Sequence, residues 1–167
     1  MEQRPRITLH LERGGDITIE LFCDKTPSSA SKVLTAFSES YYDGLSFHTC
    51  ARDEYLQFGY YDLNGYGVYA ADVDEADADS DGADAELPYR EGSLALITSK
   101  YPYLAKMQLA FLLTDKPIFS GGHEILFKTI GRVTDGYDHI KSISQCSVDE
   151  DLSPVVPIVV KNATIKK

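Results

Sequence analysis

The sequence "DADSDG", which begins at Asp77, carries carboxylates at the alternate positions that open a calcium-binding loop. An EF-hand loop needs oxygen ligands at positions 1, 3 and 5, a glycine at position 6 and a bidentate glutamate at position 12. The first four requirements are met by Asp77, Asp79, Asp81 and Gly82. Position 12 is Pro88, which has no carboxylate, and the flanking sequences lack the apolar period of a helix. We therefore expect no metal site here.

The wider stretch 72–86 holds eight carboxylates and no basic residue, interleaved with alanines. A run of like charges repels itself and stays solvated. The pattern predicts an acidic surface loop, inserted at 71–87 into one domain that spans residues 1–167. A role for this loop as an acidic tether for basic partners stays open as an alternative.

The length and net charge of the chain argue against several classes of function. The chain has 167 residues and a net charge of -10 at pH 7, which argues against binding to a nucleic-acid backbone or an anionic membrane surface. No apolar stretch approaches the ~18 residues that span a bilayer, and the charged start "MEQRPRITLH" does not resemble a secretory signal. The three cysteines, Cys23, Cys50 and Cys146, show no CxxC spacing, so reduced thiols are expected. We expect a monomer of the cytoplasm or nucleus without a cofactor.

The first 44 residues predict a hairpin followed by a helix. In "ITLHLERGGDITIELF" apolar and polar residues alternate on both sides of a Gly14-Gly15 turn, and His10 falls on the polar face. In "KTPSSASKVLTAFSESYYDG", Thr26 is the expected cap and Pro27 suits the first helical turn. One apolar stripe of this helix comprises Ala30, Val33, Leu34, Phe37 and Tyr41.

Short strand patterns dominate the rest of the chain. They are "LSFHTCA", "YLQFGYY", "SLALITS", "QLAFLLT", "LFKTIGRV" and a final "VVPIVVKNATI". A second helix is predicted at "DGYDHIKSI", where Tyr137, Ile140 and Ile143 share a face and His139 lies off it. Many short antiparallel strands with two helices predict a mostly β protein, a closed eight-stranded antiparallel barrel capped by two α-helices.

The order of these segments resembles the cyclophilin family of peptidyl-prolyl cis-trans isomerases over essentially the whole chain. The run "ITLHL…GDITIELFCDKTP…SYYDG" is most similar to the small cyclophilin-like proteins associated with the spliceosome. The resemblance weakens after Phe47, where the active site of the family begins. It implies a groove on the outer barrel wall that takes an X-Pro dipeptide.

The reaction that this resemblance implies needs neither a nucleophile nor a metal. A prolyl peptide bond isomerises over a barrier of about 18–20 kcal/mol because twisting it breaks amide resonance. The family holds the proline ring in an apolar pocket and directs an arginine at the prolyl nitrogen, whose lone pair localises as the bond twists. This is electrostatic stabilisation of a transition state.

The resemblance implies that the catalytic segment of the family is present in this chain except for its arginine. The arginine of the family falls at Thr49, so the expected donor is missing. Arg52 is a possible substitute, although strand parity points it to the opposite face from Thr49. The substrate-binding glutamine is retained as Gln57, and an aromatic of the pocket falls near Glu54 with Tyr55 beside it.

The remaining substrate-binding positions implied by the resemblance are changed in part. The amide of the peptide-binding strand is replaced by Thr98, and the tryptophan position falls at Ile118. The leucine of the pocket becomes Phe119, its phenylalanine is expected at Phe111, and its histidine matches His123 in "GGH". Packing roles for the aromatic residues, a backbone-bonding role for His123 and a solvent-facing position for Gln57 remain alternatives.

Two functions follow from the resemblance. The first is a cyclophilin-type isomerase that binds X-Pro segments of a client, with weak or lost catalysis. The second is a non-catalytic cyclophilin-fold interaction module in a spliceosome-like assembly, with spliceosomal proteins as partners. Whether the chain is an enzyme turns on the loss of the arginine at Thr49.

Overall fold

The computed structural model describes residues 4–13, 15–62, 87–98, 108–120 and 123–166. The described strands are β1 Arg6–Leu11, β2 Asp16–Leu21, β3 Leu45–Ala51, β4 Tyr55–Asp62, β5 Ser93–Thr98, β6 Leu109–Leu112, β7 Ile118–Ser120, β8 His123–Asp135 and β9 Val160–Lys166. The described helices are α1 Pro27–Ser38 and α3 Tyr137–Ser144. The acidic stretch 72–86 and the aspartates of "DADSDG" lie outside these residues.

The predicted N-terminal hairpin is confirmed. β1 and β2 pair antiparallel, with Ile7 opposite Ile19 and Leu9 opposite Ile17. All four side chains are fully buried, because period-two alternation sends them to the inner face of the sheet. Gly15 has a φ of +87°, a left-handed conformation that suits glycine in the turn.

Helix α1 begins as predicted at Pro27, but Thr26 does not cap it with its side chain. The Thr26 hydroxyl donates instead to the Phe22 carbonyl oxygen at 2.9 Å. This bond ties the start of the helix to the end of β2, so the threonine orients the helix without satisfying its first N–H groups. The buried residues of α1 are Ser29, Ala30, Val33, Ala36 and Phe37.

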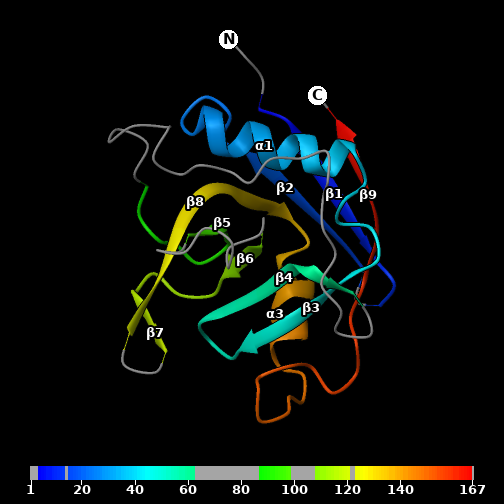
Figure 1. Cartoon of the computed structure of the whole chain (residues 1–167), viewed down its shortest axis with the longest axis vertical. Coiled ribbons are helices and arrows are strands. Elements are labelled where there is room, and N and C mark those ends of the chain that lie inside the picture. Colours follow the sequence, from blue (N-terminus) through cyan, green and yellow to red (C-terminus); the bar gives the residue numbers. More distant parts are fainter. Residues whose placement is uncertain (1–3, 14, 63–86, 99–107, 121–122, 167) are drawn as a thin grey trace.

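Helix α3 follows β8 after Gly136, whose φ is +85°. Ile140 and Ile143 are buried and His139 is exposed, as the sequence predicts. In Figure 1, α1 crosses one end of the curled sheet and α3 lies at its other side, beside β3 and β4. Neither of these two helices is long and apolar enough to cross a membrane.

The sheet is a curled half-barrel and not the predicted closed barrel. Eight antiparallel strands follow the order β3-β4-β6-β5-β8-β2-β1-β9, and β7 pairs with β8 off this path. Between the two end strands, β3 and β9, no ladder forms within the described residues; an isolated bridge joins Ser46 to Val159. Proline lacks the N–H that a ladder needs. Pro157 lies inside the predicted final strand, which is consistent with a strand that begins only at Val160, later than predicted.

Aromatic rings fill the inside of this curl. The Phe47 and Phe58 ring centroids lie 5.0 Å apart, and Phe58 stacks on Phe111 at 5.6 Å. Tyr42, which follows α1, packs on Phe58 at 5.7 Å. Each ring is at most 1% exposed, so the inner faces of β3, β4 and β6 are joined in one core.

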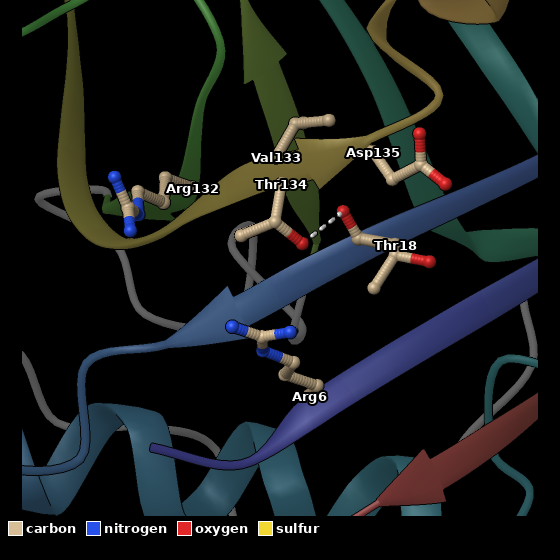
Figure 2. Close-up of a pocket in the computed structure, with 6 residues that line it drawn as sticks. All are labelled: Arg6, Thr18, Arg132, Val133, Thr134 and Asp135. Atoms are coloured by element: carbon tan, nitrogen blue, oxygen red, sulfur yellow. Dashed lines mark hydrogen bonds between the residues drawn. The ribbon is translucent and has the colours of Figure 1, made fainter. Parts of the chain in front are cut away.

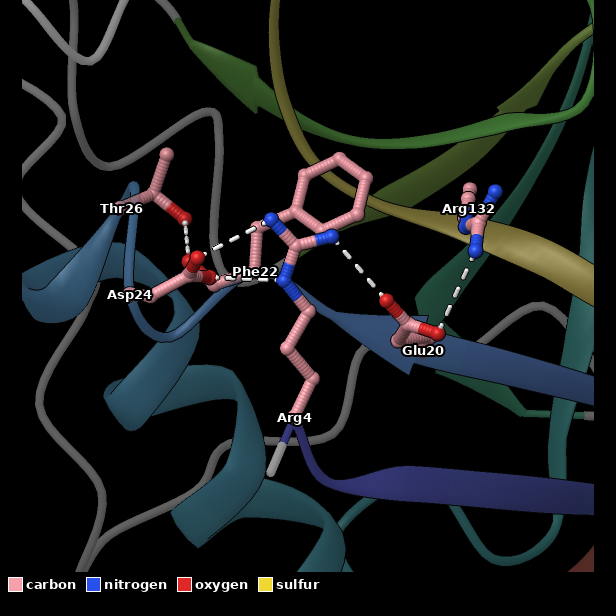
Figure 3. Close-up of polar contacts among 6 residues, drawn as sticks. All are labelled: Arg4, Glu20, Phe22, Asp24, Thr26 and Arg132. Atoms are coloured by element: carbon pink, nitrogen blue, oxygen red, sulfur yellow. Dashed lines mark hydrogen bonds and ion pairs between the residues drawn. The ribbon is translucent and has the colours of Figure 1, made fainter. Parts of the chain in front are cut away.

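Arg4 connects the entrance of β1 to the exit of β2 (Figure 3). Its guanidinium donates to both carboxylate oxygens of Asp24, at 2.8 and 3.0 Å, and to Glu20 at 3.0 Å. The same group lies 4.4 Å from the ring centre of Phe22, and Arg132 approaches Glu20 from β8 at 3.6 Å. The hydrogen bond from Arg4 holds the pKa of Asp24 below its usual range.

Replacing Arg4 with alanine is expected to lower the free energy of unfolding by about 1 kcal/mol, since a bidentate, charge-assisted pair is lost at a site only partly screened by solvent. Urea unfolding at pH 7 measures this change. Arg6→Ala, at an exposed arginine two residues further along the chain, is the matched control and should cost less than about 0.5 kcal/mol. Equal losses in both variants would contradict a specific role for Arg4.

Candidate functional site on the outer face of β4 and β6

The register of β4 and β6 decides which side chains face outward. Tyr55 lies opposite Leu112, and Gln57 lies opposite Ala110. Successive side chains of a strand point to opposite faces. Because Phe58 is in the inner core, the odd-numbered neighbours Tyr55 and Gln57 are placed on the outer face, together with Ala110 and Leu112.

An apolar cluster covers this outer face and is distinct from the inner core. Its buried members, which we call the outer apolar cluster, are Ala51, Tyr55, Ala95, Ala110, Leu112, Ile118 and Phe127. The Tyr55 and Phe127 ring centroids lie 5.4 Å apart, and Tyr89 meets Phe127 edge-on at 6.0 Å. The Phe127 amide donates to the Tyr89 hydroxyl oxygen at 3.0 Å, which fixes both rings. The cluster brings together two expected site residues, Tyr55 and Ile118.

A polar group borders the outer apolar cluster. Thr49 pairs with Gln57 across β3 and β4. The Gln57 side-chain amide donates to the Gln108 side-chain oxygen. Nδ1 of His48 lies 3.0 Å from the Thr49 hydroxyl. Desolvation lowers the pKa of His48 to about 4, while a hydrogen bond with Gln108 acts in the opposite direction. His48 is therefore a neutral imidazole at pH 7 and supplies no positive charge.

Arg52 is directed away from this polar group. It is exposed, and its guanidinium donates to the Gln145 carbonyl oxygen at 3.0 Å. Gln145 is the C-cap of α3, where a cation is favoured by the helix dipole. The guanidinium thus binds the end of α3 and does not point toward Gln57. This geometry agrees with strand parity and gives no support to Arg52 as a substitute donor.

Phe111 lies on the inner face, not beside Tyr55 and Gln57. It is fully buried, stacked on Phe58, with Phe47 at 6.3 Å. The pocket position expected at Phe111 is therefore placed in the core. Its strand neighbours Ala110 and Leu112 face the outer cluster instead.

The other expected substrate-binding residues are placed by backbone pairing alone. Thr98 lies opposite Leu126, and Phe119 lies opposite Glu124 in the β7–β8 hairpin. His123 opens β8 opposite Ser120. The side chains of these three expected residues lie outside the described part of the structure, so their roles remain predictions.

Sequence reasoning missed Phe127 as a member of this face. Phe127 and Thr129 are two positions apart on β8, so their side chains point to the same face of the sheet, and both are buried. The apolar run "ILF" at 125–127 gives no alternation that would assign a face to Phe127. The outward position of Ala110 and Leu112 could not be inferred either, because every residue of β6 is apolar.

A cavity separate from the outer apolar cluster lies on the outside of β1, β2 and β8, with a volume of about 510 Å³ (Figure 2). It is lined by Arg6, Thr18, Arg132, Val133, Thr134 and Asp135. The Thr134 hydroxyl donates to the Thr18 carbonyl oxygen at 3.4 Å, across the floor of the cavity. None of its lining residues belongs to the outer apolar cluster, and its polar lining offers no surface for a proline ring.

Residues 6–165 match the family model described as cyclophilin type peptidyl-prolyl cis-trans isomerase/CLD. The chain is 27% identical over 157 residues to peptidyl-prolyl cis-trans isomerase CYP59 of Arabidopsis thaliana, covering 90% of this chain but only 30% of that protein. It is 24% identical to mouse peptidyl-prolyl cis-trans isomerase-like 3, covering 95% of this chain and 94% of the relative. A Cryptosporidium parvum cyclophilin type isomerase, crystallised in the presence of the dipeptide Ala-Pro, has a TM-score of 0.69 at 21% identity, covering 97% of this chain and 99% of that structure.

The low pKa of His48 makes stability depend on pH. The folded protein holds this group neutral to about pH 4, whereas the unfolded chain protonates it near 6.5. Between those values the unfolded state binds more protons, so stability falls as the pH falls, by up to about 3 kcal/mol. Urea unfolding between pH 7 and 4.5 should show a smaller loss for His48→Gln than for wild type. His139→Gln, at an exposed histidine, is the control. An NMR titration midpoint near 6.5 for His48 would contradict this burial.

Proposed function

The chain belongs to the family of cyclophilin type peptidyl-prolyl cis-trans isomerases, and we propose that its outer face binds X-Pro segments while accelerating their isomerisation only weakly. The outer apolar cluster consists of hydrocarbon and aromatic side chains, the chemistry that a proline ring needs, and a bound ring would have to displace part of its close packing. Gln57 lies at the edge of this surface, on the strand that also carries Tyr55. The proposal assigns the proline ring to the cluster and the substrate backbone to Gln57.

Weak catalysis is proposed because Thr49, at the position where the resemblance places an arginine, carries no charge. The prolyl nitrogen gains a localised lone pair as the peptide bond twists, and a cation or strong donor beside it lowers the barrier. Thr49 lies across from Gln57 but carries only a hydroxyl, which is already 3.0 Å from His48. Arg52 donates to the end of α3. Loss of one preorganised donor typically costs about 10²–10³ in rate.

Apolar contacts alone still permit binding. Enclosing a proline ring removes hydrocarbon from water, and this stabilises the cis, trans and twisted forms alike. Uniform binding of this kind does not accelerate the chemical step. The chain would then bind a proline-containing client with little turnover.

The second candidate is a non-catalytic interaction module in a spliceosome-like assembly. It is favoured by the hydrogen bond that already links Gln57 to Gln108, because the substrate backbone must compete with that bond. Leu112 is fully buried and Ile118 is 2% exposed, so the outer apolar cluster is closely packed without a ligand. Under this proposal the chain is a monomer in the cytoplasm or nucleus, and partners contact a proline segment or the outer surface.

Introducing the missing cation tests the catalytic proposal. Thr49→Arg should raise kcat/KM at least about 10-fold, since it returns a donor to the position opposite Gln57. Cis-trans exchange of an Ala-Pro tetrapeptide, followed by NMR exchange spectroscopy, measures turnover without a coupled protease. Thermal unfolding of the variant checks that it is folded.

Arg52→Ala is the matched control, because it removes an arginine from the same hairpin without touching the outer face. Its turnover should equal that of wild type. Robust wild-type turnover that Arg52→Ala abolishes would contradict the proposal. Absence of activity in wild type and Thr49→Arg, with the peptide still bound, would favour the interaction module.

A further inference from the structure

The two ends of the curled sheet meet at a seam between β3 and the chain from α3 to β9. The Cys50 amide donates to the Leu152 carbonyl oxygen at 2.8 Å, and the Phe47 amide donates to that of Ile158 at 2.9 Å. The Ser153 hydroxyl donates to the His48 carbonyl oxygen at 2.9 Å. Within the described residues these separate hydrogen bonds and one isolated bridge join the two ends of the sheet, where no continuous ladder forms.

Cys50 places a thiol at this seam. It is 2% exposed, and its Sγ–H donates to the Ser144 carbonyl oxygen at 3.4 Å. Ser144 is the last residue of α3, and Cys146 follows two positions later. The Cys146 amide donates to the Ile143 carbonyl oxygen at 3.0 Å, which turns the chain back along the helix end. The Arg52 contact to Gln145 holds this turn against β3.

The Cys146 side chain is a neighbour of Cys50, because the Cys50 thiol bonds to the carbonyl oxygen of Ser144, two residues before Cys146, and the pKa of Cys50 responds to Cys146. Burial, the largest cause, together with the charge and hydrogen bond of the neighbouring Cys146 thiol, raises the pKa of Cys50 to about 12, while Arg52 acts in the opposite direction. Both side chains pack against the same core. Cys146 is the more exposed of the pair.

We propose that Cys50 and Cys146 are a redox-sensitive pair, and that a peroxide joins them in a disulfide that closes the seam. Cys146, as the more exposed residue, reacts first: its thiol loses a proton, the sulfur attacks one peroxide oxygen and the O–O bond breaks, which leaves a sulfenic acid and a hydroxide that takes up that proton as water. Cys50 then loses its proton, and its sulfur attacks the Cys146 sulfur. An S–S bond forms, hydroxide leaves and takes up that proton as water. Overall, two thiols and one hydrogen peroxide give one disulfide and two waters.

The disulfide would join strand β3 to the turn after α3 across a loop of roughly 100 residues, a length at which cross-linking strongly restricts the unfolded chain. Thr49 and Ala51 flank Cys50 on β3, and Ala51 belongs to the outer apolar cluster. The bond would therefore also fix the strand that borders the proposed proline-binding face. The inference does not depend on that face being active.

The experiment treats the reduced full-length chain with a small excess of hydrogen peroxide, blocks remaining thiols and digests without reductant. The three cysteines fall on separate tryptic peptides, 14–25, 33–52 and 142–161, so each possible link has its own mass. We expect a cross-linked pair of 33–52 and 142–161, two hydrogens lighter than the sum. The oxidised chain should unfold roughly 5–15 °C higher than the reduced chain.

Cys23→Ser is the matched control and should form the same link with the same rise in Tm. Cys50→Ser and Cys146→Ser should each abolish the link and the rise, and their Tm under reducing conditions shows whether they fold. Sulfinic or sulfonic acid at Cys146 without the link would overturn the proposal. So would links through Cys23, a covalent dimer, or a link that leaves Tm unchanged.

Discussion

The stacking of Phe47, Phe58 and Phe111 is the interaction on which the rest of the structure depends. One ring comes from each of β3, β4 and β6, and all three are buried in the same core. A slip of one residue would move a ring to the other face, so the stack fixes how these strands pair. The same register then sets Tyr55, Gln57 and the neighbouring positions of β6 on the outside. Inner packing therefore determines the composition of the outer face.

Much of the fold could be predicted from the sequence because its periodicity is simple. The hairpin alternates strictly, and the predicted strand 45–51 and helix start at Pro27 match the structure. The closed barrel could not be predicted reliably, because closure depends on how β3 meets the chain beyond α3. Pro157 removes one backbone donor there, although the surrounding valines resemble a strand.

The candidate site was less predictable for a physical reason. β6 is buried on both faces, so its sequence has no polar residue to mark the outward side. Phe111 was assigned outward by resemblance, whereas its ring completes the inner stack. Thr49 and Gln57 lie opposite each other on β3 and β4, and their roles in the site remain predictions.

The residues proposed for peptide binding, for weak catalysis and for the redox pair come together on β3. Its backbone closes the seam, Cys50 faces α3, and the residues on either side of it border the outer apolar cluster. Binding of an X-Pro segment to that outer face can be measured by a backbone-amide NMR titration of the 15N-labelled chain with an Ala-Pro tetrapeptide. Saturable shifts should concentrate at Gln57, Ala110 and Leu112; shifts concentrated at Arg6, Thr18 and Arg132, or no shifts at millimolar peptide, would contradict it.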